Sequence, residues 1–251
     1  MKPPRKRWWH TARWMRTDDG GMYEMKRINL EEIGSTNDYA KELRYAGEDL
    51  VITAGKQTSG RGTKGRSFLS EEGGVYLTLL RFYEDFPAKD AFKIMSGVAV
   101  AVCETLCFYG LSPVIKWPND VYVGGKKICG ILIENALSGN KISSSVVGVG
   151  LNVSNPLAEE LADIATSISQ EGEKTPTVDE VTEKLIEELC KERTIVEYRA
   201  YLGFVGEQVT LILENARVTA KLLSVDNEGR LLAEIDGEKR VFSSAEVSVR
   251  I

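Results

Sequence analysis

From Lys26 onward, apolar and polar positions follow regular patterns that predict a succession of strands and helices. Runs rich in β-branched and aromatic residues predict strands over 26–33, 49–57, 73–83, 113–123, 126–135 and 143–153. Patterns with helical spacing predict helices from Ser35 to about Ala46, over 88–110 and over 177–202. Strands and helices that follow one another in this way predict an α+β domain.

The pattern changes after Leu202, where short strands are separated by turn-forming residues such as Asn215 and Gly229. Five such strands predict a small barrel over 204–251, appended to a larger domain over 25–203. Residues 1–24 are basic, rich in tryptophan and without a sustained period, so we expect a disordered basic extension there. The alternative for this extension is an arm that binds nucleic acid or a partner protein.

Net charge, histidine content and the distribution of apolar residues exclude several classes of function. A net charge of −5 and an apolar fraction of 43% over 251 residues favour a soluble globular protein over one that coats nucleic acid. The single histidine, His10, lies in the extension, so multi-histidine zinc sites are excluded and a serine–histidine mechanism would depend on that residue. The sequence shows neither a secretory signal nor an apolar run near the roughly 20 residues that span a bilayer. We therefore expect a cytoplasmic protein that does not bind a membrane.

The first candidate for chemistry is the stretch GKQTSGRGTKGRSF over 55–68. Three of its glycines have the G-x-G-x-x-G spacing of a dinucleotide-binding fingerprint, but a strand rather than a helix is predicted after them. A P-loop would need a lysine and a hydroxyl residue after Gly60, and the sequence has Arg-Gly instead. Glycines interleaved with Arg61, Lys64 and Arg66 predict a loop that binds an anion through backbone N–H groups and cations. The alternative is a glycine-rich surface turn with solvated charges.

The second candidate is KWPNDVYVGGKKICGILIE over 116–134. Pro118 cannot donate a ladder hydrogen bond, so we expect Asn119 and Asp120 to project from a kink. Lysines at 126–127 precede apolar residues, and burying a lysine is costly unless it meets an anion. The alternative is that these lysines are the exposed charges of a hairpin.

Five stretches of the chain occur together in a characteristic order. They are GSTN (34–37), QTSGRGTKGRSF (57–68), GGVYLTLL (73–80), KWPNDVYVGGKKICGILIE (116–134) and GVGLNV (148–153). In order and spacing they resemble the biotin protein ligases, and with the terminal barrel the resemblance covers 26–251. It implies the fold class: a mixed β-sheet packed against helices, in a class II synthetase-like catalytic domain, followed by a small SH3-like β-barrel.

The resemblance also implies an activity. Enzymes of this family use ATP and Mg²⁺ to convert biotin to biotinyl-5′-AMP, and pyrophosphate is released. They then transfer biotin to a lysine of a biotin carboxyl carrier domain, as in acetyl-CoA carboxylase or pyruvate carboxylase. Magnesium would be held through the phosphates.

Some relatives carry an N-terminal winged helix-turn-helix. The stretch before Lys26 is too short for such a domain, so we expect no DNA binding of that kind. A homodimer remains an open alternative.

The resemblance assigns residues to the site. Contacts with biotin are implied for Ser35, Thr36, Asn37, Gln57, Gly60, Arg61, Lys127, Gly130, Leu132, Gly148 and Gly150. Contacts with the nucleotide are implied for Arg61, Gly62, Thr63, Lys64, Gly65, Arg66, Phe68, Lys116, Asn119 and Asn152. The catalytic set is Lys127, Arg61, Arg66 and Asp120. The three cations would neutralise developing negative charge, and Asp120 would orient the incoming lysine amine or take its proton.

Two residues depart from the family pattern, which often has arginine at Thr63 and tryptophan at Phe68. Without the arginine we expect looser retention of the adenylate unless Lys64 compensates, whereas Phe68 can still stack on adenine.

Two alternative functions remain. One is a lipoate or octanoate ligase or transferase, which shares the fold, and the other is a ligand-binding module without catalysis.

Overall fold

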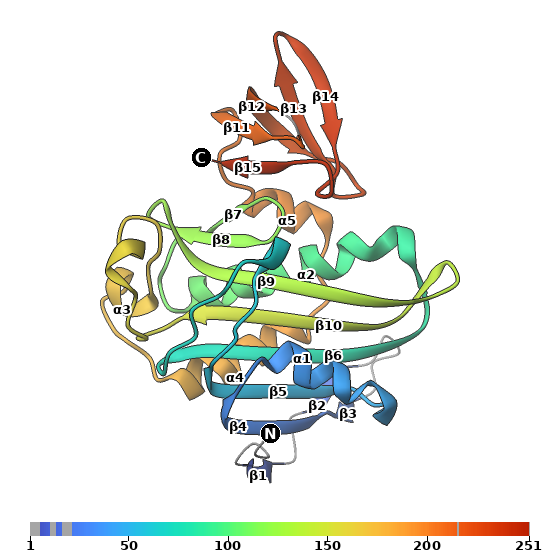
Figure 1. Cartoon of the computed structure of the whole chain (residues 1–251), viewed down its shortest axis with the longest axis vertical. Helices are drawn as coiled ribbons and strands as arrows, with labels where there is room; N and C mark the ends of the chain where they lie inside the picture. Colours follow the sequence, from blue (N-terminus) through green and yellow to red (C-terminus); the bar gives the residue numbers. More distant parts are fainter. Residues whose placement is uncertain (1–5, 11–13, 17–21, 215, 251) are drawn as a thin grey trace.

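The computed structural model describes residues 6–10, 14–16, 22–214 and 216–250, and its main body is built on one eight-stranded sheet (Figure 1). In spatial order the strands are β1 (Lys6–His10), β4 (Lys26–Ile33), β5 (Leu50–Gln57), β6 (Gly74–Pro87), β10 (Lys141–Asn152), β9 (Lys126–Ser138), β8 (Asp120–Val123) and β7 (Val114–Lys116). β4 and β5 run parallel, and the other neighbouring pairs are antiparallel. The expectation of a mixed sheet is confirmed.

Helices cover both faces of this sheet. α1 (Thr36–Glu42) packs on one face, and α2 (Ala91–Phe108), α4 (Val178–Leu189) and α5 (Ile195–Tyr201) pack together on the other. Successive side chains of β6 point to opposite faces of the sheet and so contribute to two hydrophobic cores. Leu77 and Leu79 belong to the core with α2, whereas Leu80 packs with Ala40 of α1. The shorter helical turns are α3 (Ile168–Glu171), η1 (Arg44–Ala46), η2 (Thr63–Gly65), η3 (Ala88–Asp90) and η4 (Glu159–Leu161).

α2 with the turn before it, Ala88–Phe108, is the one helical segment among the described residues that is long and apolar enough to cross a bilayer. The sequence analysis predicted this helix over 88–110, but it found no apolar run long enough to span a bilayer. Half of this apolar stretch is buried inside the protein, where Val100, Cys103 and Leu106 are fully enclosed in the main core. A helix that is apolar on most sides is what a position between a sheet and other helices requires.

The expected single helix over 177–202 is two helices. The predicted capping box of Thr177 and Glu180 is present at the start of α4. A second capping box, formed by Thr194 and Glu197, starts α5. The prediction of one helix was wrong because α4 ends at Leu189, and Thr194, in extended backbone, then caps a new helix.

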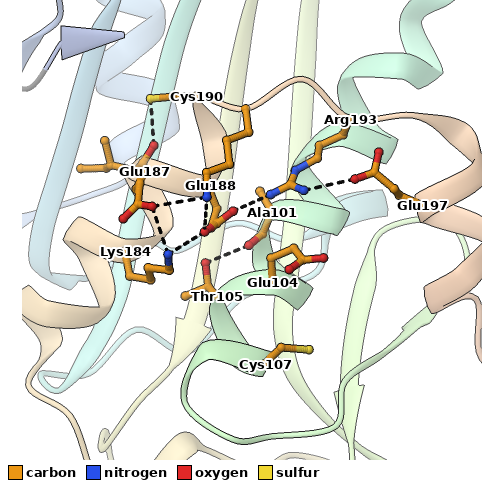
Figure 2. Close-up of polar contacts among 12 residues, drawn as sticks. Ala101, Glu104, Thr105, Cys107, Lys184, Glu187, Glu188, Cys190, Arg193 and Glu197 are labelled. Carbon is orange, nitrogen blue, oxygen red and sulfur yellow. Dashed lines mark hydrogen bonds and ion pairs between the residues drawn. The ribbon is translucent and has the colours of Figure 1, made fainter. Parts of the chain in front are cut away.

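The bend between α4 and α5 encloses a buried carboxylate. Glu188 is 4% exposed and its oxygens pair with Lys184, Lys191 and Arg193. Figure 2 shows Lys184, Glu188 and Arg193 gathered beside α2. Burial alone would raise the pKa of Glu188, but hydrogen bonds from Lys184 and Lys191 outweigh it, and the pKa is lowered. Charge pairing therefore holds the bend.

The N-terminal region contains short strands where the sequence predicted a disordered extension. β1 pairs antiparallel with β4, and β2 (Trp14–Arg16) pairs with β3 (Met22–Glu24). Backbone groups at the free edge of β4 can pair with any extended segment, which needs no periodic sequence. Residues 1–5, 11–13 and 17–21 of the predicted extension lie outside the described residues.

The strand expected over 113–123 is also two strands. β7 and β8 pair with each other, and Trp117, Pro118 and Asn119 form the turn between them. Pro118 has no N–H for a ladder, so the chain reverses there, as the predicted kink required. Asn119 is buried, and its side-chain amide donates to the carbonyl of Ile131 on β9 at 2.8 Å.

The C-terminal segment forms the predicted five-stranded unit. In spatial order its strands are β14 (Glu238–Phe242), β13 (Leu231–Ile235), β12 (Arg217–Val225), β11 (Gln208–Ile212) and β15 (Ser248–Arg250), all antiparallel. It lies beyond the β7 edge of the main sheet (Figure 1). The turn between β12 and β13 docks it, because Trp117 donates its indole N–H to the carbonyl of Gly229 at 2.8 Å and Arg199 donates to Val225.

Candidate active site

Three glycines leave the centre of the sheet bare on the face that α1 covers. Gly150 of β10 is paired with Gly130 of β9, and Gly148, two residues earlier, is paired with Leu132. Val149 between them packs into the main core on the opposite face. We call Gly130, Gly148 and Gly150 the glycine floor.

Two side chains lie directly on the glycine floor. A Cβ atom on Gly150 would stand 2.6 Å from the ring of Phe68, and one on Gly148 would stand 2.3 Å from Oδ1 of Asn37. Both distances are well inside van der Waals contact, so glycine at these positions is what gives Phe68 and Asn37 their room.

A cavity of about 290 Å³ lies over the glycine floor. Its charged lining residues are Arg61, Arg66, Asp120 and Lys127. The predicted site residues that line it are Ser35, Thr36, Asn37, Gln57, Arg61, Gly62, Thr63, Arg66, Phe68, Asn119, Asp120, Lys127, Gly130, Leu132, Gly148 and Gly150. The structure thus brings together segments that lie more than a hundred residues apart, which periodicity alone could not place.

The α1 end of the cavity carries neutral hydrogen-bonding groups. Gln57 Oε1 accepts from the backbone N–H of Thr36 at 2.9 Å and from its hydroxyl at 3.0 Å. The buried hydroxyl of Thr78 on β6 lies 2.8 Å from Thr36 Oγ1 and 2.7 Å from Asn37 Oδ1. Ser35 caps α1. This end suits a neutral polar group such as an amide or a urea, because its partners are uncharged donors and acceptors.

A second part of the cavity wall is an ion pair. Lys127 Nζ on β9 donates to Asp120 Oδ1 on β8 at 2.7 Å, and the two side chains are 31% and 19% exposed. Backbone hydrogen bonds of 2.9 Å join Lys127 N to Ile164 O and Thr166 N to Lys127 O. Lys127 is therefore held on both its side chain and its backbone.

The glycine loop, residues 58–69, folds back on itself beside the cavity. Backbone hydrogen bonds join Gly62 N to Arg66 O at 2.6 Å and Phe68 N to Gly60 O at 2.9 Å. A Cβ on Gly60 would stand 2.3 Å from the carbonyl oxygen of Phe68. Gly60 is thus required where the loop closes at its base, rather than on the surface that a ligand would reach.

Arg61 is a charged side chain of this loop that lines the cavity. Its Nη1 donates to Asp38 Oδ1 at 2.6 Å, and its Nη2 lies 3.5 Å from Glu134 Oε1. The hydrogen bond to Asp38, followed by the charge of Glu134, raises the pKa of Arg61. Burial alone would raise the pKa of Asp38, but hydrogen bonds from Lys41 and Arg61 lower it overall. Asp38 and Arg61 are therefore both charged at neutral pH.

A second cavity, of about 380 Å³, shares part of its wall with the first and reaches the barrel. Four cations line it: Lys64, Arg66, Lys116 and Arg250. Burial lowers the pKa of Lys116, and neighbouring cations add to the shift while Asp120 opposes it. A chamber with this excess of positive charge suits a polyanion.

Some predicted residues lie elsewhere. Lys64 and Lys116 line the second cavity and not the first, and Gly60, Gly65 and Asn152 line neither. Asn152 is buried, and its side-chain amide donates to the carbonyl of Thr166 at 2.9 Å, so it shapes the chain after β10. A contact between these last three residues and a ligand stays a prediction.

Other lining residues were not predicted; they are Ser67, Leu77, Ile131, Val149, Leu161 and Ile164. Leu161 and Ile164 belong to the irregular segment after β10, which follows no strand or helix period. Ile164 is 60% exposed, which is a property of the folded chain that no sequence pattern reports.

Comparison with known proteins agrees with this geometry. The model of the biotin/lipoate A/B protein ligase family matches residues 30–152, and the biotin protein ligase C terminal domain matches 204–250. The bifunctional ligase/repressor BirA of Bacillus spizizenii is 34% identical over 86% of this chain and 72% of its own. The biotin–[acetyl-CoA-carboxylase] ligase of Mycobacterium tuberculosis is 29% identical over 87% of this chain and 86% of its own. A structure of biotin protein ligase from Aquifex aeolicus, in complex with biotin and ATP, has a TM-score of 0.75 and 29% identity, and the match covers 89% of this chain and 98% of that one.

The match over 30–152 defines the class, the protein ligases related to biotin and lipoate attachment. Within this class, the match of the C-terminal domain and the 34% identical relative both point to biotin protein ligases. The chain therefore belongs to the biotin protein ligase family, which is a family of enzymes. The resemblance seen in the sequence and the two-part fold class are confirmed.

Proposed function

We propose that this enzyme uses ATP to activate biotin as biotinyl-5′-AMP and then transfers biotin to a lysine of a biotin carboxyl carrier domain in the cytoplasm. The observation that carries the proposal is that Arg61, Arg66 and Lys127 line one cavity over the glycine floor. The similar Aquifex aeolicus protein, in complex with biotin and ATP, supports it. The name of the Mycobacterium tuberculosis relative supports a carrier domain of acetyl-CoA carboxylase as acceptor.

Biotin fits the polarity of the first cavity. Its neutral ureido ring would take hydrogen bonds at the Thr36–Gln57 end, and its apolar tail would rest on the glycine floor. Its carboxylate would then meet Lys127 and the two arginines, which attract an anion that the rest of the cavity does not favour.

In the first step, a biotin carboxylate oxygen attacks the α-phosphorus of ATP, the bond to the β-phosphate oxygen breaks, and pyrophosphate leaves. The two reactants are both anions, so cations fixed beforehand at Arg61, Arg66 and Lys127 offset their repulsion and the charge that develops. The triphosphate would occupy the second cavity, with Lys64, Lys116 and Arg250 on its walls.

Magnesium bound with ATP would supply further neutralisation at the phosphate oxygens. Within the described residues, no group of three or more histidine, cysteine or acidic side chains could hold a metal ion. We therefore assign its ligands to the phosphates of ATP.

In the second step, the acceptor lysine amine attacks the acyl carbon, AMP leaves with the bonding electron pair, and the amine loses a proton. Asp120 can take that proton because it lines the cavity, provided that it releases Lys127, its present partner at 2.7 Å. Lys127 would meanwhile stay beside the phosphate of the leaving AMP.

Biotin-dependent exchange of radiolabelled pyrophosphate into ATP tests the first step, and labelled biotin incorporated into a carrier domain tests the second. Lys127→Ala should lower the exchange by at least about 100-fold. Lys126→Ala is the matched control, since Lys126 donates to the carbonyl of Ala162 and does not line the cavity. Exchange that needs no biotin, or equal losses in both variants, would refute the proposal. Separate calorimetric titrations with biotin and with lipoate would show which of the two ligands binds, and so test the lipoate alternative.

A further inference from the structure

A buried threonine of β6, Thr78, lies beneath the α1 end of the first cavity. It stands between two leucines of the strand, is fully buried and does not line the cavity. In the sheet it is paired with Gly148 of the glycine floor. Because Gly148 has no side chain, Asn37 of α1 can reach Thr78; a Cβ on Gly148 would stand 2.3 Å from Asn37 Oδ1.

Two side-chain amides at this end of the cavity have a fixed orientation. The NH2 group of Gln57 donates to a serine hydroxyl at 2.9 Å, and its Oε1 accepts from the backbone N–H of Thr36. The NH2 group of Asn37 faces two acceptors of β9 at 3.4 Å, a backbone carbonyl and a carboxylate. The oxygen of each amide therefore faces a threonine hydroxyl, that of Thr36 or that of Thr78.

The result is a row of four oxygens, which we call the oxygen chain: Gln57 Oε1, Thr36 Oγ1, Thr78 Oγ1 and Asn37 Oδ1. Successive oxygens lie 3.0, 2.8 and 2.7 Å apart. These three contacts share the hydrogens of only two hydroxyls, because an amide oxygen can only accept. Thr36 donates its hydrogen to Gln57, and Thr78 has a single hydrogen for Thr36 or Asn37. Toward the cavity, the Thr36 oxygen can therefore only accept a hydrogen bond.

We propose that Thr78 is a positioning residue that sets the selectivity of this end of the cavity. Its one hydroxyl contacts both Thr36 and Asn37, which line the cavity, and holds their oxygens as acceptors for a ligand N–H group. A site built in this way discriminates against an analogue that lacks the matching donor, because a polar group is then left unpaired.

This inference rests on the proposed function, and it deepens it by naming the group that is read. On that function, the matching donor is a ureido N–H of biotin. The dithiolane ring of lipoate has no N–H and would leave the Thr36 oxygen unpaired. Thr78 would then favour biotin over lipoate without contacting either.

Calorimetric titration with biotin and with two analogues tests this selectivity. In each analogue an oxygen replaces one of the two ureido N–H groups, so that the ring becomes a cyclic carbamate of almost the same size. The wild type should bind one or both carbamates about tenfold or more weakly than biotin, as expected when an acceptor is left unpaired. The ratio of the two dissociation constants measures the preference.

Thr78→Val keeps the shape of the side chain and removes the hydroxyl. Its affinity for biotin should fall by about tenfold, whereas its affinity for the discriminated carbamate should change by less than about twofold. A role in stability alone would lower both affinities together and leave the preference unchanged. Thr78→Ser keeps the hydroxyl and should keep most of the preference, and Thr78→Ala repeats the test if Thr78→Val does not fold.

Thr105→Val in α2 is the matched control. Thr105 is also fully buried, and its hydroxyl donates to the carbonyl of Ala101 at 2.8 Å, away from the cavity (Figure 2). This variant should change neither dissociation constant. A thermal melt shows that each variant is folded.

The outcomes separate the role of Thr78 from the proposed function. If the wild type binds neither biotin nor the carbamates, the proposed function fails and this inference fails with it. If the wild type binds biotin no more tightly than both carbamates, or if Thr78→Val keeps the wild-type preference, the role of Thr78 is refuted and the proposed function stands.

Discussion

At the scale of single residues, Asp120 and Lys127 have to be considered together, because only 2.7 Å separates the carboxylate oxygen from the ammonium nitrogen. Each of the two proposed steps needs one of them to release the other. Lys127 must meet the biotin carboxylate in the first step, and Asp120 must be available for a proton in the second. The ion pair holds both side chains in place until a substrate substitutes for one partner.

Asp120→Asn separates the two roles, because an amide can still accept a hydrogen bond from Lys127 but cannot take a proton at neutral pH. Transfer of biotin to the carrier lysine should fall by about 100-fold or more, while formation of the adenylate changes by less than about tenfold. Single-turnover kinetics of each half-reaction would measure this. Equal losses in both halves would mean that Asp120 acts only by holding Lys127.

At the scale of elements, the glycine floor depends on the register of β9 and β10. Gly150→Ala would place a methyl group 2.6 Å from the Phe68 ring, so the ring must leave the floor. We expect a loss of at most about 1–3 kcal/mol of stability and a clear loss of biotin and ATP affinity, measured by urea unfolding and calorimetry.

Gly97→Ala in α2 is the control for Gly150→Ala. Its added Cβ meets nothing closer than the Cβ of Arg193 at 3.9 Å, so it should stabilise the helix by up to about 1 kcal/mol and leave ligand affinity unchanged. Unchanged affinity in Gly150→Ala would show that the place of Phe68 on the floor does not matter for binding.

Elements with a clear period were predictable, because alternation and helical spacing are local properties. The strand over 26–33 matches β4, whereas the helix expected over 177–202 is broken at Thr194, whose capping box with Glu197 was overlooked. In the site, residues within dense motifs were found. Ile164 was missed because a long-range backbone hydrogen bond from Lys127 places it, and Leu161 was missed because it lies in the short turn that leads to Ile164; no local pattern reports either position.

At the scale of the whole molecule, the barrel is positioned by a turn that leaves no room for a side chain. A Cβ on Gly229 would stand 2.0 Å from Phe92, and Gly229 has φ of +77°. Gly229→Ala should undock the barrel, lower ATP affinity and leave biotin affinity almost unchanged, as measured by calorimetry. Gly237→Ala has similar backbone strain, with φ of +82° and nothing within 4 Å, and should affect neither affinity. Intact ATP binding in Gly229→Ala would count against the barrel's share of the second cavity.

Acid stability should depend on the bend between α4 and α5. The pKa of Glu188 in the folded chain lies below its usual 4.5, so its carboxylate stabilises the fold above that pH, and this contribution is lost as pH falls through the folded-state pKa. Glu188→Gln leaves three cations without their shared anion and should cost about 3 kcal/mol at pH 7. In urea unfolding, the difference in stability between Glu188→Gln and the wild type should shrink as the pH falls below 4.5. A pH-independent difference would contradict the assignment.

The glycine floor also has an evolutionary consequence. Where a ligand rests on peptide backbone, a point mutation cannot swap one recognition group for another; it can only fill the space. New selectivity must therefore arise in the surrounding walls. On the proposed function, an inhibitor that draws its affinity from the backbone of Gly130, Gly148 and Gly150 would leave few routes to resistance there, because a side chain that excluded the inhibitor would exclude biotin as well.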